Sequence, residues 1–219
     1  MKNTVKEFAV GQHIIDLCRS PQQLKRHLEQ VLSNRTPQKY IYKQTRYRPA
    51  AVLVPLYFKE GETHVLFTKR THLVEHHKGQ ISFPGGRRDR EDESLLITAL
   101  RETEEEVGIA ANDVRVLGQT DVFLTNTHYL VTPFVGFFEY PYEYKINHAE
   151  IERLVEVPLT FLLREDIFEV KNYQQNGFNW LVHYYHFGND LIWGVTGFLL
   201  SNFLSIVFQL DRNQFTVQD

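Results

Sequence analysis

The sequence predicts an α/β protein on the strength of two patterns. Residues 50–58 and 64–68 form apolar runs on either side of the turn-like Lys59-Glu60-Gly61-Glu62, which predicts a β-hairpin. Further on, side chains that suit a core recur at the i, i+3, i+4, i+7 and i+11 spacing of a helix, at Leu96, Ala99, Leu100, Thr103 and Val107. The chain therefore combines predicted strands with a core-facing helix.

The composition is that of an ordinary globular chain. With 42% hydrophobic and 23% charged residues, the 219-residue chain suits one domain with an appendage and a substantial core. A formal net charge of −3 argues against a nucleic-acid partner, which more often binds a basic stripe. Cys18, the single cysteine, excludes an internal disulfide and a multi-cysteine zinc site. No apolar run approaches the roughly 18 residues of a membrane span and no signal peptide is recognised, so we expect a cytoplasmic protein without membrane contact.

Ahead of the hairpin, the sequence predicts an amphipathic helix. Ser20 is placed as its N-cap, Pro21 as its first residue, and Gln23 as the second member of a capping box. An apolar stripe follows at Leu24, Leu28, Val31 and Leu32. The helix is expected to pack either on the main domain or on a second subunit of a homodimer, and the sequence leaves both open. The polar residues 34–47 are typical of a connector.

The core-facing helix also carries a cluster of carboxylates. Glu102, Glu105 and Glu106 stand at i, i+3 and i+4, so their side chains converge on one side and repel each other unless a positive charge lies between them. A divalent cation would supply that charge. Oxygen ligands suit Mg²⁺ or Mn²⁺, and Mg²⁺ often joins carboxylates to substrate phosphate oxygens. Gly108 is placed to end this helix.

Strands are expected again beyond the helix, at residues 114–122 and 129–138 with a loop at 124–127, and at 178–187 with a turn at 188–190. Pro133 is expected at a sheet edge or a bulge, because proline cannot donate to a ladder. Trp193, in the segment that opens the last helix, is expected in the core.

The residues from Arg101 to Ile109, RETEEEVGI, resemble the REUxEExGU half of the Nudix box, with Thr103 at the aliphatic position. A solvated, glutamate-rich surface helix is the alternative reading. That reading does not account for Phe83-Pro84-Gly85-Gly86 ahead of the helix. Six residues separate Gly86 from Glu93, where the general box has five. This longer loop, GGxxDxxDxS, is similar to that of the coenzyme A pyrophosphatase branch.

Two later segments resemble the same branch, namely VTPFVG at residues 131–136 and IWGVT at 192–196. The segment ahead of the glycines resembles its coenzyme A motif, LLTxR[S/A]xxxRxxxGxxxFPGG, with Arg70 in place. Glu75, however, stands where that motif has its second arginine, and Thr71 replaces serine or alanine. A carboxylate at that position would repel a substrate phosphate.

The resemblance implies a Nudix α/β/α sandwich, in which a mixed central sheet lies between the box helix and the C-terminal helix. We expect an N-terminal helical extension and connector at 1–47, the Nudix domain at 48–210 and a C-terminal tail at 211–219. The implied enzyme is a metal-dependent hydrolase that cleaves the diphosphate of coenzyme A or acyl-coenzyme A into phosphopantetheine and adenosine bisphosphate. Alternatives are a Nudix pyrophosphatase for ADP-ribose, NADH or a nucleotide sugar, and a Nudix-fold nucleotide-binding protein without turnover.

The resemblance also implies roles for individual residues. The expected metal ligands are Glu102, Glu105 and Glu106, and Arg101 is expected to orient them. Glu150, with Glu152 behind it, is the candidate for a further ligand or general base; a plain surface carboxylate is the alternative. The expected partners of the substrate are Arg70, Lys78, Gly85, Gly86 and Arg87.

Overall fold

The computed structural model describes residues 10–38, 47–72, 78–175 and 178–212. Its main sheet is mixed, because β1 runs parallel to β7 while the other strand pairs are antiparallel. The central order is β3-β2-β1-β7-β5, with β4 beside β1, β6 beside β7 and β8 beside β2. The strands are β1 (Arg48–Lys59), β2 (Glu62–Arg70), β3 (Ile81–Ser82), β4 (Gly85–Arg87), β5 (Arg115–Gln119), β6 (Phe123–Leu124), β7 (Tyr129–Phe137) and β8 (Ile151–Pro158).

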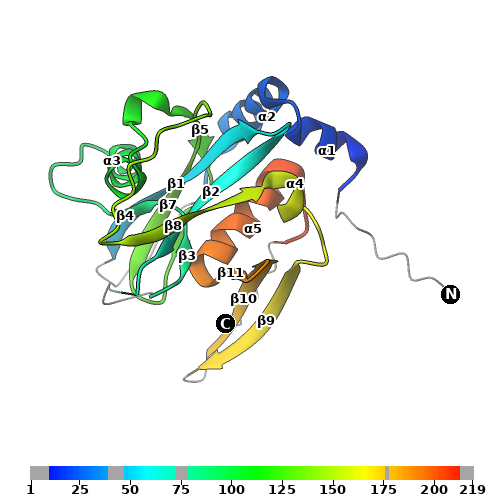
Figure 1. Cartoon of the computed structure of the whole chain (residues 1–219). Helices are drawn as coiled ribbons and strands as arrows, with labels where there is room; N and C mark the ends of the chain where they lie inside the picture. The colour runs from blue at the N-terminus through cyan, green and yellow to red at the C-terminus, as the bar shows by residue number, and fades with distance from the viewer. Residues whose placement is uncertain (1–9, 39–46, 73–77, 176–177, 213–219) are drawn as a thin grey trace.

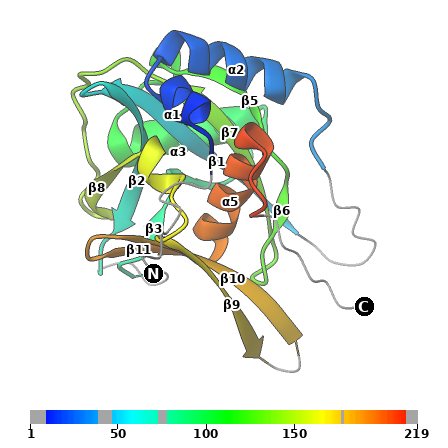
Figure 2. The ribbon, with the colours of Figure 1, turned by 90° about the vertical axis from the view of Figure 1, so that its right-hand side faces the viewer.

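Helices cover both faces of this sheet (Figures 1 and 2). On one face lies α3 (Leu95–Val107), followed by the short η1 (Ala111–Asp113). The other face carries α1 (Gln12–Cys18), α2 (Pro21–Ser33), α4 (Leu159–Leu162) and α5 (Gly194–Phe208). Alternate residues of β2 pack into the two layers, since Leu66 joins Val107 of α3 while Phe67 joins Phe203 of α5. The expected sandwich with a mixed central sheet is confirmed.

The predicted hairpin is the antiparallel pair of β1 and β2. Lys59 is opposite Glu62, so the turn has two residues, Glu60 and Gly61, whose φ angles are 52° and 90°. Two positive φ values suit the right-handed twist of a hairpin, and glycine accepts such a value without strain.

The N-terminal helix packs on its own chain. Leu24, Leu28 and Leu32 of α2 are buried in the same core as α5. Of the two packing alternatives, the main domain is therefore the one observed. The helix begins at Pro21 as expected, but the side chain of Ser20 makes no capping hydrogen bond, so the predicted capping box is wrong in that respect.

Pro133 lies in β7, an interior strand, so the expectation of a sheet edge is wrong. On one side of β7 the partner changes from β5, which pairs through Phe134, to β6, which pairs through Val131. The carbonyl of Pro133 accepts a hydrogen bond from Thr120, in the gap between those two strands. The residue without an N–H thus stands where the ladder is already interrupted.

A second sheet of three strands follows, made of β9 (Phe168–Gln175), β10 (Phe178–Phe187) and β11 (Asp190–Trp193). The predicted strand at 178–187 and its turn are confirmed. Trp193 is 40% exposed and stacks on Tyr184 with 6.1 Å between ring centroids, so its predicted place in the core is wrong. It ends an outer strand and caps α5, a position from which its ring lies on the surface of the small sheet.

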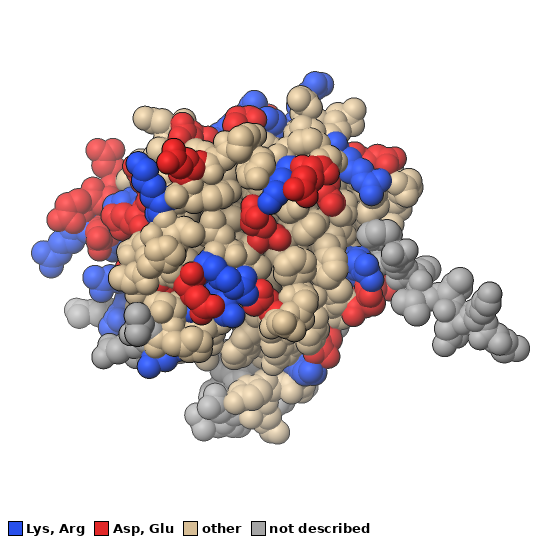
Figure 3. All heavy atoms as spheres, viewed as in Figure 1, with Lys and Arg blue, Asp and Glu red and all other residues tan. Residues whose placement is uncertain are grey.

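Cys18 is completely buried, as a small apolar filler would be, and burial raises the pKa of its thiol to about 12. Basic and acidic side chains alternate over the face in Figure 3 rather than separating by sign. Within the described residues, none of the helices is both long enough and apolar enough to cross a membrane.

Candidate active site

The helix α3 is fixed at both ends by local chemistry. Ser94 is its N-cap and accepts a hydrogen bond from the N–H of Ile97 at 3.3 Å, which satisfies one of the free donors of the first turn. Gly108 ends the helix with a φ of 78°, the left-handed conformation that glycine adopts readily. Ala99, Thr103 and Val107 are fully buried, so the predicted core face is confirmed. The glutamates are thereby held on a helix that packs on one face of the sheet.

The glycine turn brings the backbone against both the sheet and the helix. A Cβ on Gly85, whose φ is 150°, would lie 2.4 Å from the carbonyl oxygen of Ala51. A Cβ on Gly86 would lie 2.4 Å from the carboxyl carbon of Glu102. The two glycines therefore have different roles, because Gly85 allows β4 to pack on β1 and Gly86 leaves room for the Glu102 carboxylate.

We expect Gly86→Ala to lower kcat at least tenfold with little loss of thermal stability. The added methyl would displace only the end of a flexible side chain, Glu102, which is cheap for folding but misplaces a charge at the site. Gly85→Ala is the matched comparison, because its methyl would meet rigid backbone and should lower the melting temperature strongly. Steady-state kinetics and thermal melts on both variants check this. Equal loss of stability in the two would contradict it.

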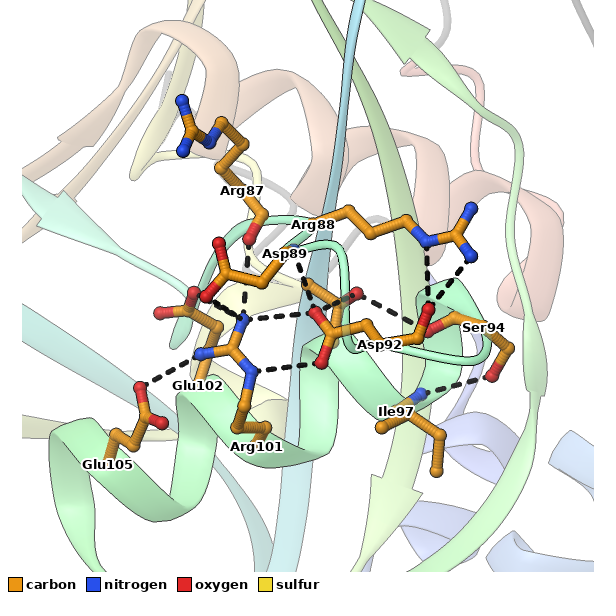
Figure 4. Close-up of polar contacts among 10 residues, drawn as sticks. Arg87, Arg88, Asp89, Asp92, Ser94, Ile97, Arg101, Glu102 and Glu105 are labelled. Atoms are coloured by element: carbon orange, nitrogen blue, oxygen red, sulfur yellow. Dashed lines mark hydrogen bonds and ion pairs between the residues drawn. The ribbon is translucent and has the colours of Figure 1, made fainter.

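Arg101 is the centre of an ion-pair network (Figure 4). Its guanidinium donates to Asp92 at 3.0 and 3.1 Å, to Glu102 at 2.9 Å and to Glu105 at 2.9 Å, and lies 3.8 Å from Asp89. These pairs hold the pKa of Arg101 above its usual range. A planar guanidinium with five donors suits such a fan of carboxylates better than an ammonium group does.

Asp92 holds Arg101 in this network through both of its carboxylate oxygens. No role was predicted for Asp92 from the sequence. Its side chain is buried and also accepts hydrogen bonds from the Thr98 hydroxyl at 2.9 Å and the Asp89 N–H at 3.0 Å. The hydrogen bonds from Arg101 hold the pKa of Asp92 well below its usual range, against the opposing effect of burial. The available signal was its place in the GGxxDxxDxS loop, nine residues before Arg101.

Glu106 is the buried carboxylate of the site, with only 4% of its surface exposed. It accepts a hydrogen bond from the N–H of Gly85 at 3.3 Å and lies 3.7 Å from the guanidinium of Arg70. Burial nevertheless raises its pKa to about 8, and the carboxylates of Glu102 and Glu150 add to the shift, while Arg70 and the Gly85 N–H oppose it. The positive charge around Glu106 therefore does not offset its desolvation.

The three glutamates are not gathered as a ready ligand set. Among the described residues there is no group of three or more His, Cys, Asp or Glu side chains arranged to hold a metal ion. Glu102 and Glu105 both bind Arg101, and the Glu105 side chain is 59% exposed. The donor chemistry still fits a hard divalent cation, because Glu106, with Glu102 beside it, is a buried oxygen donor whose ion pair with Arg70 does not offset its desolvation. Glu105 would have to exchange Arg101 for the ion.

The other predicted residues occupy different positions around this cluster. Arg70 faces Glu106, while its buried Nε has no hydrogen-bond partner among the residues that the structure describes. Arg87 extends away from Arg101 (Figure 4), and Lys78 is exposed in a turn. Glu150 is exposed at the start of β8, where its carbonyl accepts from the N–H of Thr71 at 2.8 Å.

The candidate behind Glu150 is already engaged, since Glu152 lies 3.8 Å from the ammonium of Lys69 and 4.0 Å from Arg153. Glu75 lies outside the residues that the structure describes.

Comparisons with known proteins identify the family of this chain. The NUDIX domain family matches residues 46–186. The Nudix hydrolase NudL of Photorhabdus laumondii, itself uncharacterized, is 39% identical over 153 residues, which cover 70% of this chain and 81% of that protein. The protein of the same name from Yersinia pestis is 37% identical over 153 residues, covering 70% and 76%.

A MutT/nudix family protein from Enterococcus faecalis has a solved structure with a TM-score of 0.45 and 15% identity, covering 80% of this chain and 63% of that one. The family match and the identity to the NudL proteins show that this chain belongs to the Nudix hydrolases, enzymes that act on nucleoside diphosphate derivatives and generally use divalent metal ions.

Proposed function

We propose that this Nudix hydrolase cleaves the diphosphate of coenzyme A or an acyl-coenzyme A, giving phosphopantetheine and adenosine bisphosphate. The observation that supports hydrolysis of a diphosphate is the buried Glu106, which lies next to Glu102 and Arg70 and accepts a hydrogen bond from the Gly85 N–H of the glycine turn. Support for coenzyme A comes from the sequence, since the long box loop, Arg70, the VTPFVG strand and the IWGVT segment resemble that branch.

Each residue of the proposed site has a distinct role. Glu102, Glu105 and Glu106 would hold Mg²⁺ or Mn²⁺, whose charge would stabilise the nonbridging phosphate oxygens as water attacks phosphorus. Arg101 is a positioning residue, because it holds Glu102 and Glu105 by direct ion pairs. Arg70 offers a guanidinium beside Glu106 for a phosphate oxygen.

The competing substrates are ADP-ribose, NADH and nucleotide sugars. Glu75 favours them, because a carboxylate in place of the second arginine of the coenzyme A motif opposes a phosphate at that point. A binding protein without turnover is disfavoured by the complete run from Arg101 to Gly108.

Purified protein should therefore be assayed with coenzyme A, ADP-ribose, NADH and a nucleotide sugar in the presence of Mg²⁺ or Mn²⁺. We expect coenzyme A to be cleaved, but with weak binding. The displaced or missing phosphate contact at Glu75 should make KM about tenfold to hundredfold higher than in an enzyme that has the second arginine of the motif. Glu75→Arg should lower that KM. Robust cleavage of ADP-ribose, with no cleavage of coenzyme A by either protein, would replace this substrate assignment.

We expect Glu150→Gln to lower kcat while leaving the melting temperature nearly unchanged. Glu150 is exposed, so it contributes little to folding, but its carboxylate is close enough to raise the pKa of Glu106. Glu152→Gln is the matched control, because that carboxylate already pairs with Lys69. Kinetics and thermal melts on both variants decide between them. A lower kcat in Glu152→Gln alone would transfer the role to Glu152.

A further inference from the structure

A basic pocket adjoins the proposed active site and shares Asp89 with its acidic network. It is lined by the start of β1 and by residues 87–91, which continue β4 past the glycine turn, and it contains Arg48, Arg87, Arg88 and Arg90. The pocket wall begins at Arg87, one residue after Gly86, which packs closely against the Glu102 carboxylate. Consecutive Cα atoms are about 4 Å apart, so the pocket adjoins the carboxylates.

Backbone pairing fixes both walls of this basic pocket. Ala50 of β1 pairs with Arg87 of β4, and the N–H of Arg88 donates to the carbonyl of Pro49 at 3.0 Å. The N–H of Arg48 donates to the carbonyl of His128 at 2.9 Å. Arg48, Arg87 and Arg88 are therefore carried by paired backbone, whereas Arg90 lies in the loop that follows β4.

The positive charge of the pocket is not neutralised by its surroundings. Arg88 donates to the backbone carbonyls of Asp92 and Glu93, at 2.8 and 3.4 Å, and these are neutral acceptors. Arg48 lies over the ring of Tyr129, with 5.9 Å between its guanidinium carbon and the ring centroid.

No carboxylate among the described residues forms an ion pair with any of the four arginines. Of the two acidic residues in the wall, Asp89 lies 3.8 Å from Arg101, so its charge is shared with the network on α3. Glu91 is the other acidic residue of the wall, and four arginines against it leave the pocket positive, which favours binding of an anion.

We propose that this pocket binds a phosphomonoester on the nucleoside end of the substrate, through Arg48, Arg88 and Arg90. The inference rests on the proposed function, in which the ribose phosphate of coenzyme A is such a group. A guanidinium is suited to phosphate, because its planar donors can bind two oxygens at once. The pocket thus supplies, on the side of β1 and β4, a phosphate contact that the coenzyme A motif lacks at Glu75.

The test compares coenzyme A with dephospho-coenzyme A, which lacks that phosphate, in the wild type and in Arg48→Ala/Arg90→Ala. We expect the ratio of the two kcat/KM values to fall about tenfold to hundredfold in the variant, while dephospho-coenzyme A is affected little. Arg19→Ala/Arg26→Ala, which removes one exposed arginine just after α1 and one in α2, is the charge-matched control and should keep the wild-type ratio. Arg90→Ala alone is the second variant in case the double variant does not fold, because the exposed side chain of Arg90 forms no ion pair among the described residues.

If the double variant keeps the kcat/KM ratio of the control, or loses kcat/KM equally for both substrates, the proposed phosphate site is refuted. Hydrolysis of coenzyme A as the function would remain supported. If the wild type cleaves neither substrate, the proposed function fails, and calorimetry without metal still tests the pocket. There, adenosine 3′,5′-bisphosphate should bind at least tenfold more tightly than AMP, and the double variant should remove the difference. Inorganic phosphate that binds as tightly as the bisphosphate would show a site for the free ion and would also overturn the proposal.

Discussion

Glu106→Gln is expected to lower kcat by about a hundredfold or more, the scale of losing a major electrostatic contributor at a reacting phosphate. Glu106 is buried, and burial raises its pKa to about 8. Desolvation therefore destabilises the ionised carboxylate, and the charge of a bound metal ion would offset that destabilisation. The substitution keeps the shape and an oxygen that can accept from the Gly85 N–H, but it removes the charge.

The same variant should be at least as stable as the wild type, because it relieves the desolvation of a buried carboxylate. Steady-state kinetics and thermal melts together separate this from a folding defect. Glu104→Gln is the matched control on the same helix, since Glu104 is exposed and should alter kcat little. Chelation with excess EDTA should abolish wild-type activity, and full turnover in EDTA would refute the role of these glutamates.

Asp92→Ala is expected to lower the free energy of unfolding by about 3 kcal/mol, the lower end of the range for breaking a buried ion pair. Asp92 is buried and binds Arg101 through both carboxylate oxygens, whereas Arg101 is partly exposed and keeps some hydration. Removal of the carboxylate also frees Arg101 from the position in which it holds Glu102 and Glu105. We therefore expect kcat to fall as well.

Urea unfolding with and without the substitution measures this loss of free energy. Asp92→Asn is the informative second variant, because it retains the shape and an acceptor for Thr98 but removes the charge that Arg101 binds. Glu139→Ala, which removes a highly exposed partner of Lys25, should leave stability within experimental error. A similar small effect at Asp92 would mean that the network is not an anchor.

Several elements followed from the sequence because local rules are sufficient for them. The β1–β2 hairpin is set by two apolar runs and a turn that contains glycine, and the observed positive φ of Gly61 is what that turn requires. The end of α3 at Gly108 and its buried stripe likewise depend on backbone conformation and helical spacing. The box resemblance indicated the family for the same reason, since its glycines and glutamates are close together in the chain.

The sequence alone thus determined the fold class, the box helix and the set of glutamates that compete for positive charge. The tertiary structure decided which of them is buried, because only the packing of α3 on the sheet encloses Glu106 and leaves Glu105 in solvent. It also joined Asp92 to Arg101, placed Trp193 on the surface and brought Arg48 and Arg90 to the lining of one pocket. The physical reason is that burial and ion pairing depend on distances across separate elements, whereas propensity and spacing describe only neighbours along one element.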